Sequence, residues 1–396
     1  MLKEKIKDLA TDFHEEVIHI RRHLHQHPEL SFEEVETGKY IARKLKSFGI
    51  DFEHGMAENG VVALIKGHNP EKKVIALRGD IDALPIKEAN EVPYKSKHEG
   101  VMHACGHDVH TASLLGTAKI LHAVKDHFEG TIKLIFQPGE ERLPGGASVM
   151  IKEGVLQNPV PLSIFGQHVH PPLEAGKVGV RPGMYMASAD ELFLTVTGQG
   201  GHGALPQNCV DPIVITAHII VALQQIVSRN ANPTTPTVLT LGKINSTGGA
   251  TNIIPTEVKL QGTFRTMDEV WRKEAHQKMI KIAESIAEGM GGKCKLEVNH
   301  GYPFLVNNED LTYRAKQHAI EFLGADKVVD LPIRMTAEDF AYYSQQIPAC
   351  FYRLGIRNEA QGITSNVHTD TFDIDESALE LSIGLMAWLA IKELAV

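Results

Sequence analysis

The densest group of potential metal ligands lies in the stretch VMHACGHDVHTASLL, residues 101–115. Thiol, imidazole and carboxylate groups all fall within it: Cys105, His107 and Asp108, with His103 and His110 more loosely placed. These are the side-chain types that bind transition metals. An apolar pattern typical of a helix follows at once. We interpret this stretch as the source of the first ligands of a hydrolytic metal centre.

A pair of adjacent glutamates, Glu140 and Glu141, follows a Gln-Pro-Gly turn. Neighbouring carboxylates cannot both point the same way, so one can bind a metal while the other faces a substrate as general base. A hydrolase that uses metal-activated water needs this division, because the metal lowers the water's pKa and a free carboxylate takes its proton. Alone, such a pair would be a solvated turn; beside the Cys105 cluster, the functional interpretation is favoured.

Histidines elsewhere in the chain could complete the centre. His168 comes directly after a predicted strand, and we choose it over His170 as a ligand. His368 lies in the late segment NVHTD and on its own would be an unremarkable surface residue. Cys105 is compatible with zinc, manganese, cobalt or nickel, so the ligand types do not decide which metal is bound.

The elements that must position these residues alternate between strands and helices. We expect helices over residues 2–24, 32–48, from the Cys105 cluster to about 124, and 147–152, and strands over 61–65, 74–77, 131–136 and 162–166. This order predicts an α/β domain with a mostly parallel sheet and helices on both faces. Ligands gather beyond the carboxyl ends of such strands. Asp82, Glu140, Glu141 and His168 all fall just past predicted strand ends.

The pattern changes after Pro182. Strands at 191–197, 237–244, 258–264 and 295–298, with helices at 212–227 and 268–290, form a compact βαββαβ-like block with helices on one face. We therefore expect an inserted α+β domain over 183–295, and a main domain from 1–182 and 296–396. Helices at 310–323, 337–345 and 377–394 and a strand at 350–354 complete the main domain.

Composition excludes several classes of partner. The net charge of −9 argues against nucleic acid, which needs a basic face. No apolar run reaches the roughly 20 residues that span a bilayer. The charged N-terminus lacks the apolar core of a secretory signal, and the four cysteines are widely spaced. We expect a cytoplasmic protein without a disulfide framework.

Two formal motifs fail on their spacing or context. His14, Glu15 and His19 resemble a zincin motif, but the second histidine comes five residues after the first instead of four. Gly198, Gly200 and Gly203 spell G-x-G-x-x-G, but Ala-Leu-Pro intervenes before any helix. We therefore reject a dinucleotide site there.

The motifs, taken together, resemble the aminoacylase and glutamate-carboxypeptidase family of metallohydrolases. The matching segments are LRGDIDALPI at 77–86, MHACGHDVHTASLLG at 102–116, IFQPGEE at 135–141, GQHVHP at 166–171, GQGGHGALP at 198–206, TNIIP at 251–255, GTFRTMD at 262–268, MTAEDFAYY at 335–343 and VHTDTFD at 367–373. The nearest subgroup contains the N-acyl-L-amino acid amidohydrolases, the hippurate hydrolases and the hydrolases of plant auxin conjugates.

This resemblance implies an exopeptidase-like catalytic domain with an inserted lid or dimerisation domain, and a homodimer or higher homo-oligomer. It implies two divalent ions (Zn, Mn, Co or Ni) held by Cys105, His107, Glu141, His168 and His368. Glu140 would be the general base, and Asp82 would orient a ligand.

In the inserted domain, the resemblance assigns His202 to oxyanion stabilisation. Asn252 and Arg265 would hold the carboxylate of the substrate. The expected reaction is hydrolysis of the amide in a small N-acyl amino acid.

Other activities stay open at this point. Deacetylation of N-acetyl-diaminopimelate and dipeptide cleavage are variants within the family. A cysteine hydrolase that uses Cys105 with His107 would leave the remaining ligands unexplained. A non-catalytic small-molecule binder would not need the base Glu140.

Overall fold

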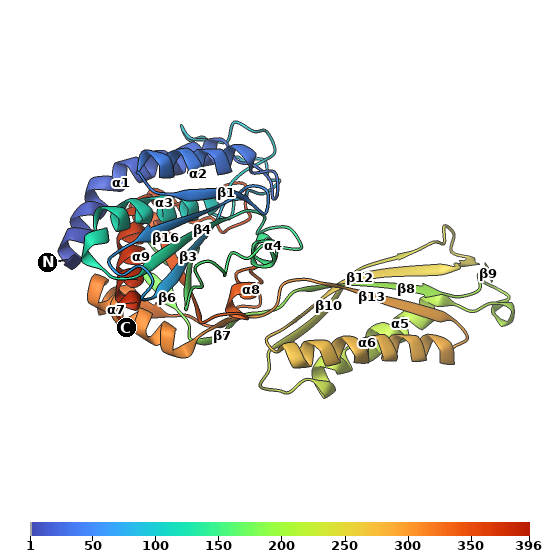
Figure 1. Cartoon of the computed structure of the whole chain (residues 1–396). Coiled ribbons are helices and arrows are strands. Elements are labelled where there is room, and N and C mark those ends of the chain that lie inside the picture. The colour runs from blue at the N-terminus through green and yellow to red at the C-terminus, as the bar shows by residue number, and fades with distance from the viewer. Residues whose placement is uncertain (1) are drawn as a thin grey trace. The chain divides into compact units, whose positions relative to one another are not determined.

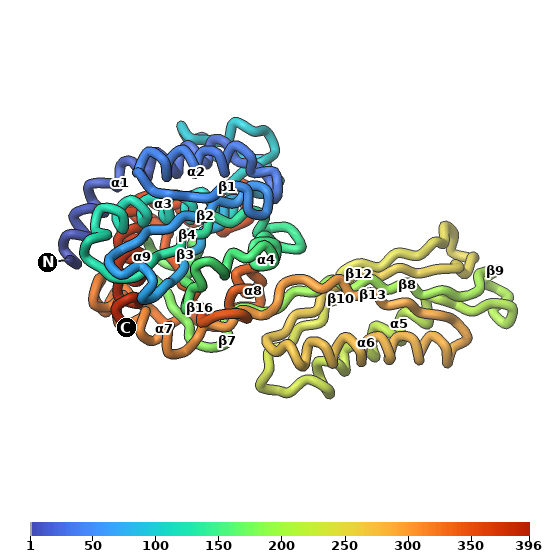
Figure 2. The backbone as a smooth tube through the Cα atoms, viewed as in Figure 1, coloured from blue at the N-terminus to red at the C-terminus, as the bar shows by residue number. Residues whose placement is uncertain are grey.

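A computed structural model describes residues 2–396, which divide into two compact units (Figure 1). The first unit contains the residues up to Gly183 together with Val306–Ile333 and Asp339–Val396. The second contains Met184–Leu305 and Arg334–Glu338. In Figure 2 the blue-to-green start and the orange-to-red end of the chain run through the first unit, so the second unit is an insertion.

An eight-stranded sheet forms the centre of the first unit, in the order β1-β2-β4-β3-β5-β16-β6-β15. Its strands are β1 Phe52–Met56, β2 Gly60–Lys66, β3 Val74–Asp80, β4 Thr131–Gln137, β5 Ile164–Glu174, β6 Val178–Val180, β15 Val328–Asp330 and β16 Ala349–Arg357. The adjacent strands β4, β3, β5 and β16 are parallel. The pairs β1–β2, β2–β4 and β16–β6 are antiparallel, and β15 is parallel to β6. The prediction of a mostly parallel α/β sheet is confirmed.

The central strands are buried on both faces, which explains their continuous apolar runs. Every residue of β3 and β4 is buried. The helices of the first unit are α1 Leu2–Gln26, α2 Val35–Ser47, α3 His107–Ala123, α4 Gly146–Lys152, α7 Glu309–Leu323, α8 Ala341–Ser344 and α9 Ala378–Leu394. Helices α3 and α9 pack against β3, and α1 packs against both of these helices.

The second unit is a four-stranded antiparallel sheet with two helices on one face (Figure 1). Its main elements are β8 Asp190–Thr197, α5 Pro212–Leu223, β10 Thr237–Ser246, β12 Glu257–Thr266, α6 Glu269–Gly289 and β13 Lys293–His300. A short pair, β9 Gly201–His202 and β11 Ile253–Ile254, lies beside them. The remaining strands are β7 Gly183–Met186 and β14 Leu305–Asn307. The predicted order βαββαβ is the observed one.

Several predicted bounds were wrong. The expected helix over 337–345 shortens to α8, Ala341–Ser344, and the expected helix over 32–48 begins only at Val35. Strand β5 continues to Glu174, so His168 and His170 lie within the strand and not beyond its end. The reason is that β16 pairs with β5 along most of this extension.

One helical segment among the described residues, Pro212–Asn230, is long and apolar enough to cross a membrane by length and composition. In this structure the segment belongs to the core of the second unit. Ile215, Ile219 and Leu223 are buried in that unit's apolar cluster, and α5 ends at Leu223 before a π-helical turn over Ile226–Asn230.

Candidate metal centre

A left-handed glycine places the first two candidate ligands. Gly106 has φ +84° and caps the start of α3 between Cys105 and His107. A Cβ atom on Gly106 would lie 2.6 Å from the Val169 side chain, so only glycine allows both the backbone conformation and this close approach. The ligand-bearing turn therefore packs directly against β5, next to His168.

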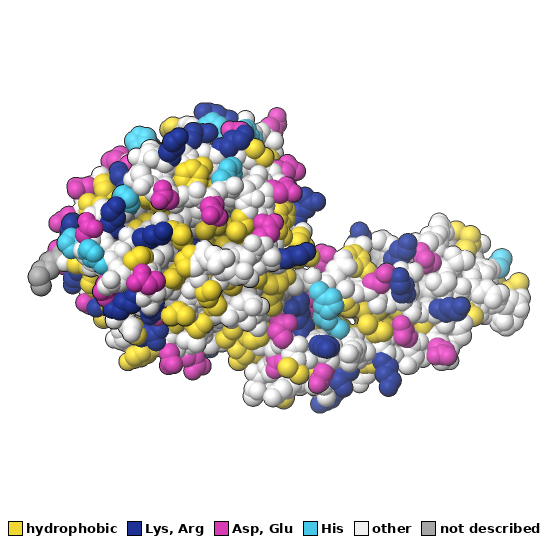
Figure 3. All heavy atoms as spheres, in the orientation of Figure 1, with side chains coloured by type: hydrophobic (Ala, Val, Ile, Leu, Met, Phe, Trp, Pro, Cys, Tyr) yellow, Lys and Arg dark blue, Asp and Glu magenta, His cyan; other side chains and the backbone are white. Residues whose placement is uncertain are grey.

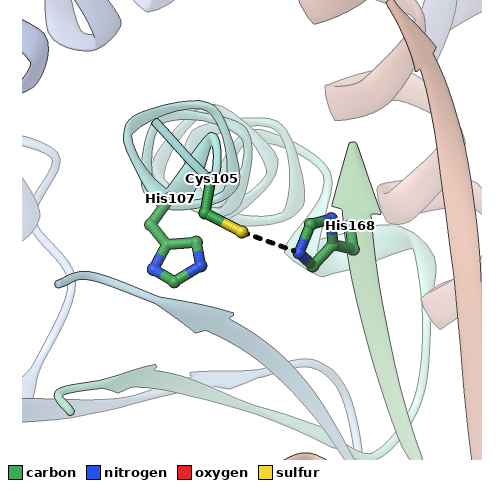
Figure 4. A group of neighbouring side chains, drawn as sticks. All are labelled: Cys105, His107 and His168. Carbon is green, nitrogen blue, oxygen red and sulfur yellow. Dashed lines mark hydrogen bonds between the residues drawn. The ribbon is translucent and has the colours of Figure 1, made fainter. Parts of the chain in front are cut away.

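The side chains of Cys105, His107 and His168 converge (Figure 4). Cys105 Sγ lies 3.5 Å from His168 Nε2. The other ring nitrogen of His168, Nδ1, lies 2.8 Å from the carbonyl oxygen of Val169. This bond requires a proton on Nδ1, so the Nε2 lone pair faces the cysteine, as in histidines that bind metals.

A second group forms around the same sulfur atom. His368 Nε2 lies 3.3 Å from Cys105 Sγ and 3.1 Å from Glu141 Oε1. The ligand atoms of Cys105, Glu141 and His368 all lie within 4.8 Å of one another, as do those of Cys105, His107 and His168. The structure thus brings the five predicted ligands together in two groups of three that share Cys105.

Asp82 connects two of these residues from behind. Its Oδ1 lies 3.0 Å from His107 Nδ1, and its Oδ2 accepts the backbone N–H of Glu141 at 2.9 Å. Ser31 Oγ also donates to Oδ2, at 2.6 Å. Asp82 therefore fixes the ring of His107 with Nδ1–H toward the carboxylate and leaves Nε2 to face the cluster.

Glu140 has a different environment from its neighbour. It is buried, its Oε1 accepts the backbone N–H of Asp339 at 3.2 Å, and its Oε2 lies 4.0 Å from His107 Nε2. His368 and Cys105 group with Glu141 and not with Glu140. Glu140 does group with His107 and Glu141, so the two adjacent carboxylates differ in that only Glu141 lies beside Cys105 and His368.

The electrostatics of the cluster favour a cation. Burial opposes the charged form of His107, but the carboxylates of Asp80, Asp82 and Glu141 outweigh burial and raise its pKa to about 10. Burial, Glu141 and Glu140 raise the pKa of the Cys105 thiol well above its usual value. A protonated thiol is a poor nucleophile, which disfavours a cysteine hydrolase. Cation binding displaces these protons.

The residues present fit divalent metal ions. His107 Nε2 and Glu141 Oε1 are buried and make no hydrogen bond among the described residues, although His368 Nε2 lies 3.1 Å from Glu141 Oε1 as a possible ion pair. Buried polar atoms without hydrogen-bond partners are costly. A bound cation would satisfy both, and the set of thiolate, imidazole and carboxylate donors suits zinc and its neighbours.

Three residues of the opening motif lie outside the cluster. Asp108 Oδ2 accepts from Arg21 on α1, and His110 is hydrogen-bonded to Asp80 and to the backbone N–H of Val169. Both ring nitrogens of His103 are buried without a hydrogen bond among the described residues. Of the residues in this motif, Cys105 and His107 lie in the two groups of three that share Cys105, whereas His110 groups with Asp80 and His107.

Sequence reasoning missed two supporting acids. Asp80 Oδ2 lies 3.8 Å from His107 Nε2 and 2.6 Å from Arg78 Nη1. Arg78 also donates to Asp339 Oδ1 at 2.7 Å. Asp80 could have been found from the alternation of side chains along a strand, because residues 78, 80 and 82 fall on the same side of the sheet. For Asp339 the only signal was its presence in the segment MTAEDFAYY.

The remaining predicted residues belong to the second unit. His202 lies on β9, and the backbone N–H of Gly203 bonds to the carbonyl oxygen of Asn252 at 2.8 Å. Arg265 lies on β12, and its Nη1 donates to Met335 O at 3.1 Å. His202 and Asn252 are thus neighbours across a two-stranded ribbon.

The model of peptidase family M20/M25/M40 matches residues 76–392. The chain belongs to this family. It is 42% identical to the N-acetyl-L-cysteine deacetylase of Bacillus subtilis over 92% of this chain and 85% of that protein. It is 43% identical to the N-acyl-L-amino acid amidohydrolase of Geobacillus stearothermophilus, over 78% of this chain and 83% of that protein.

Among solved structures, the chain resembles the YXEP protein of Bacillus subtilis, described as a dinuclear metal binding peptidase of family M20. The TM-score is 0.84, with 36% identity and coverage of 97% of this chain and 99% of that one. The predicted family, hydrolase class and pair of divalent metal ions are therefore confirmed for this M20 chain.

Proposed function

We propose that this M20 enzyme hydrolyses the amide bond of small N-acyl amino acids and that Glu140 is its general base. The observation that carries the proposal is the division of the adjacent glutamates. Glu141 groups with both Cys105 and His368, whereas Glu140 groups with neither and accepts the backbone N–H of Asp339. The names of the amidohydrolase and deacetylase relatives support this substrate class.

We assign Cys105, His107, Glu141, His168 and His368 as the residues that would hold the two ions. Bound divalent ions act as Lewis acids and lower the pKa of a coordinated water. Glu140 accepts the proton of the attacking water and passes it to the leaving nitrogen. Which of Zn, Mn, Co and Ni is the natural ion follows from elemental analysis of the purified protein.

His202 is the proposed donor to the oxyanion. The backbone N–H of Ala204 donates to His202 Nδ1 at 3.1 Å. Nδ1 is therefore the acceptor, and the neutral ring carries its proton on Nε2. The exposed ring can donate this N–H to a developing negative charge.

Arg265 and Asn252 are the proposed carboxylate-binding residues. A guanidinium carries five N–H groups, and the described bond of Arg265 to Met335 O uses one of them.

The decisive experiment compares the two neighbours, Glu140→Gln and Glu141→Gln. Glu140→Gln should retain two equivalents of zinc and lose turnover of N-acetyl amino acids by about 10²–10⁴-fold, the usual contribution of a general base. Glu141→Gln should instead bind zinc more weakly. Undiminished turnover by Glu140→Gln would overturn the assignment.

Substrate choice is tested with a panel of N-acetyl amino acids, hippurate, auxin conjugates, N-acetyl-diaminopimelate and dipeptides. We expect hydrolysis of N-acyl amino acids with a free carboxylate and little hydrolysis of the corresponding carboxamides, because Arg265 needs a charged partner. Faster hydrolysis of dipeptides or of N-acetyl-diaminopimelate would show that the proposed substrate class is wrong. Absence of hydrolysis across the panel would support a binding protein.

We further propose a homodimer that forms through the inserted unit. Ile213 and Val214 are 46% exposed and Val221 is 74% exposed on α5, and such an apolar helix face favours a partner surface.

We propose a small-molecule substrate, no membrane or nucleic-acid partner, and a cytoplasmic location. The face of the first unit in Figure 3 mixes basic with acidic side chains, and all four cysteines are free. Light scattering and cell fractionation test these assignments.

A further inference from the structure

Arg21 is a completely buried arginine outside the assigned ligand set. It lies on α1 and has 0% exposure. Its guanidinium points to three carboxylates: Nε to Asp108 Oδ2 at 2.8 Å, Nη2 to Asp373 Oδ1 at 2.9 Å and Nη1 to Glu376 Oε1 at 3.2 Å. A buried charge needs such partners to be tolerated.

The partners of Arg21 come from the two segments that carry the shared ligand and the last ligand. Asp108 directly follows His107 at the start of α3. Asp373 and Glu376 follow His368 before α9 begins. Arg21 is therefore a bridge between two parts of the chain that must stay together for the second ligand group to exist.

The segment around His368 needs such support. His368 has φ +63°, a left-handed conformation that is strained for a residue with a side chain. Its side chain is 51% exposed, whereas that of Glu141 is 14% exposed. Backbone bonds hold the segment from His368 N–H to Ala104 O at 2.7 Å and from Ala89 N–H to Asp370 O at 2.8 Å. Asn90 Nδ2 also donates to Phe372 O at 2.9 Å. The Arg21 contacts are a further attachment, which ties Asp373 and Glu376 to Asp108 at the start of α3.

Tyr94 strengthens the attachment through Arg21. Its hydroxyl donates to Asp373 Oδ2 at 2.8 Å, and its ring lies 4.7 Å from the Arg21 guanidinium carbon. The carboxylate of Asp373 is thus held from two sides. Lysine could not replace Arg21, because a single ammonium group cannot span three carboxylates in the way that a planar guanidinium does.

We propose that Arg21 is a positioning residue for the metal centre, which holds the His368 segment against the start of α3 so that His368 stays beside Cys105 and Glu141. The inference rests on the ligand assignment in the proposed function. It predicts that the loss of Arg21 weakens binding of the ion that His368 holds, without removing any ligand.

Arg22 provides a matched control. It is the adjacent arginine and binds the same Glu376, at 2.6 Å between Nη2 and Oε2, but its side chain is 44% exposed. Among the described contacts of Arg22, none reaches Asp108 or Asp373. Arg22→Met therefore removes an arginine–Glu376 pair and a contact of 4.9 Å between the Arg22 guanidinium carbon and the Tyr94 ring. It leaves the contacts of Arg21 with Asp108 and Asp373 in place.

The experiment measures Zn²⁺ affinity of the full chain by competition with a chromophoric chelator, with melting of the metal-free protein as a check of folding. Arg21→Lys and the milder Asp373→Asn should weaken the second equivalent of zinc about tenfold and change the first less than threefold. Arg22→Met should bind both equivalents as the parent does. Folded Arg21→Lys and Asp373→Asn proteins with parental affinity for both would overturn the inference.

A double-variant cycle separates positioning from general stabilisation. In the His368→Ala background, adding Arg21→Lys should change zinc affinity less than twofold, because no loop ligand remains to be placed. A second tenfold loss there would show that Arg21 acts through overall stability, and would overturn the inference. If His368→Ala alone bound both equivalents of zinc with parental affinity, the assignment of His368 as a ligand would be wrong. The proposed role of Arg21 would then be wrong as well.

Discussion

Asp82 offers a sharp test of the metal centre because one carboxylate supports two assigned ligands. Its Oδ1 faces His107 Nδ1 at 3.0 Å, while its Oδ2 accepts from Glu141 N at 2.9 Å and from Ser31 Oγ at 2.6 Å. Asp82→Asn keeps the shape of the side chain but replaces one acceptor with an NH₂ donor. It leaves every ligand present, so any loss of metal comes from orientation.

The new side-chain amide of the Asp82→Asn variant can take two orientations, and each loses one of the hydrogen bonds that Asp82 makes. With NH₂ toward His107, Nδ1 must become the acceptor, and Nε2 then carries the proton and cannot bind a cation. With NH₂ toward Glu141, two N–H groups oppose each other. A hydrogen bond to a charged group contributes about 1.5–3 kcal/mol, so zinc affinity should fall about 10–100-fold, as for other residues that orient metal ligands.

The assay is zinc competition on Asp82→Asn, with Asp12→Asn as control, since Asp12 is an exposed acid on α1. Ser31→Ala should show a smaller loss, because it removes a single bond to Asp82 and no charge. Parental zinc affinity in a folded Asp82→Asn protein would refute the argument that Asp82 fixes His107 and Glu141.

Two further outcomes follow from ligation and from burial. Chelation should lower the melting temperature, and added zinc should restore it, because free ion at a hundredfold excess over Kd stabilises a protein by about 2.7 kcal/mol per site; a His107→Ala protein that responds as strongly as the parent would contradict this. Burial and Asp82 raise the pKa of Glu34 to about 7, so the folded state holds a proton that the unfolded state loses between about pH 4.5 and 7, and stability falls as pH rises through that window. We expect the free energy of unfolding of metal-free Glu34→Gln, measured in urea, to rise by up to about 3 kcal/mol relative to that of the parent between pH 4.5 and 8. If the difference in unfolding free energy between the two proteins did not change with pH, the shifted pKa of Glu34 would be contradicted.

Part of the metal centre was predictable because parallel strands end at one edge of a sheet. β3, β4 and β5 are neighbours in the sheet, so residues at the ends of the first two must lie near His168 on the third. That topology brings Asp82 and the Glu140–Glu141 pair together from segments far apart in the sequence. The alternation of strands and helices was sufficient to predict this convergence.

His368 could be placed only by resemblance, because its local sequence carries no structural signal. Its position depends on β16, which pairs with β5 far along the sequence, and on a left-handed backbone conformation at a non-glycine residue. Propensity does not predict either feature.

Asp108 belongs to the motif that supplies the first ligands, although it is not among the five assigned ligands. Adjacent residues on a helix point about 100° apart. His107 faces the cluster, whereas Asp108 faces Arg21 on α1.

Cys105 and His368 are 263 residues apart, and the whole inserted unit is synthesised between them. A ribosome therefore releases β5 long before β16, the strand that pairs with it on the side away from β3. Until then the nascent chain carries an open edge in its central sheet, which favours wrong association between unfinished molecules. The group of Cys105, Glu141 and His368 can therefore bind its ion only when translation is almost complete, whereas Cys105, His107 and His168 are all synthesised earlier.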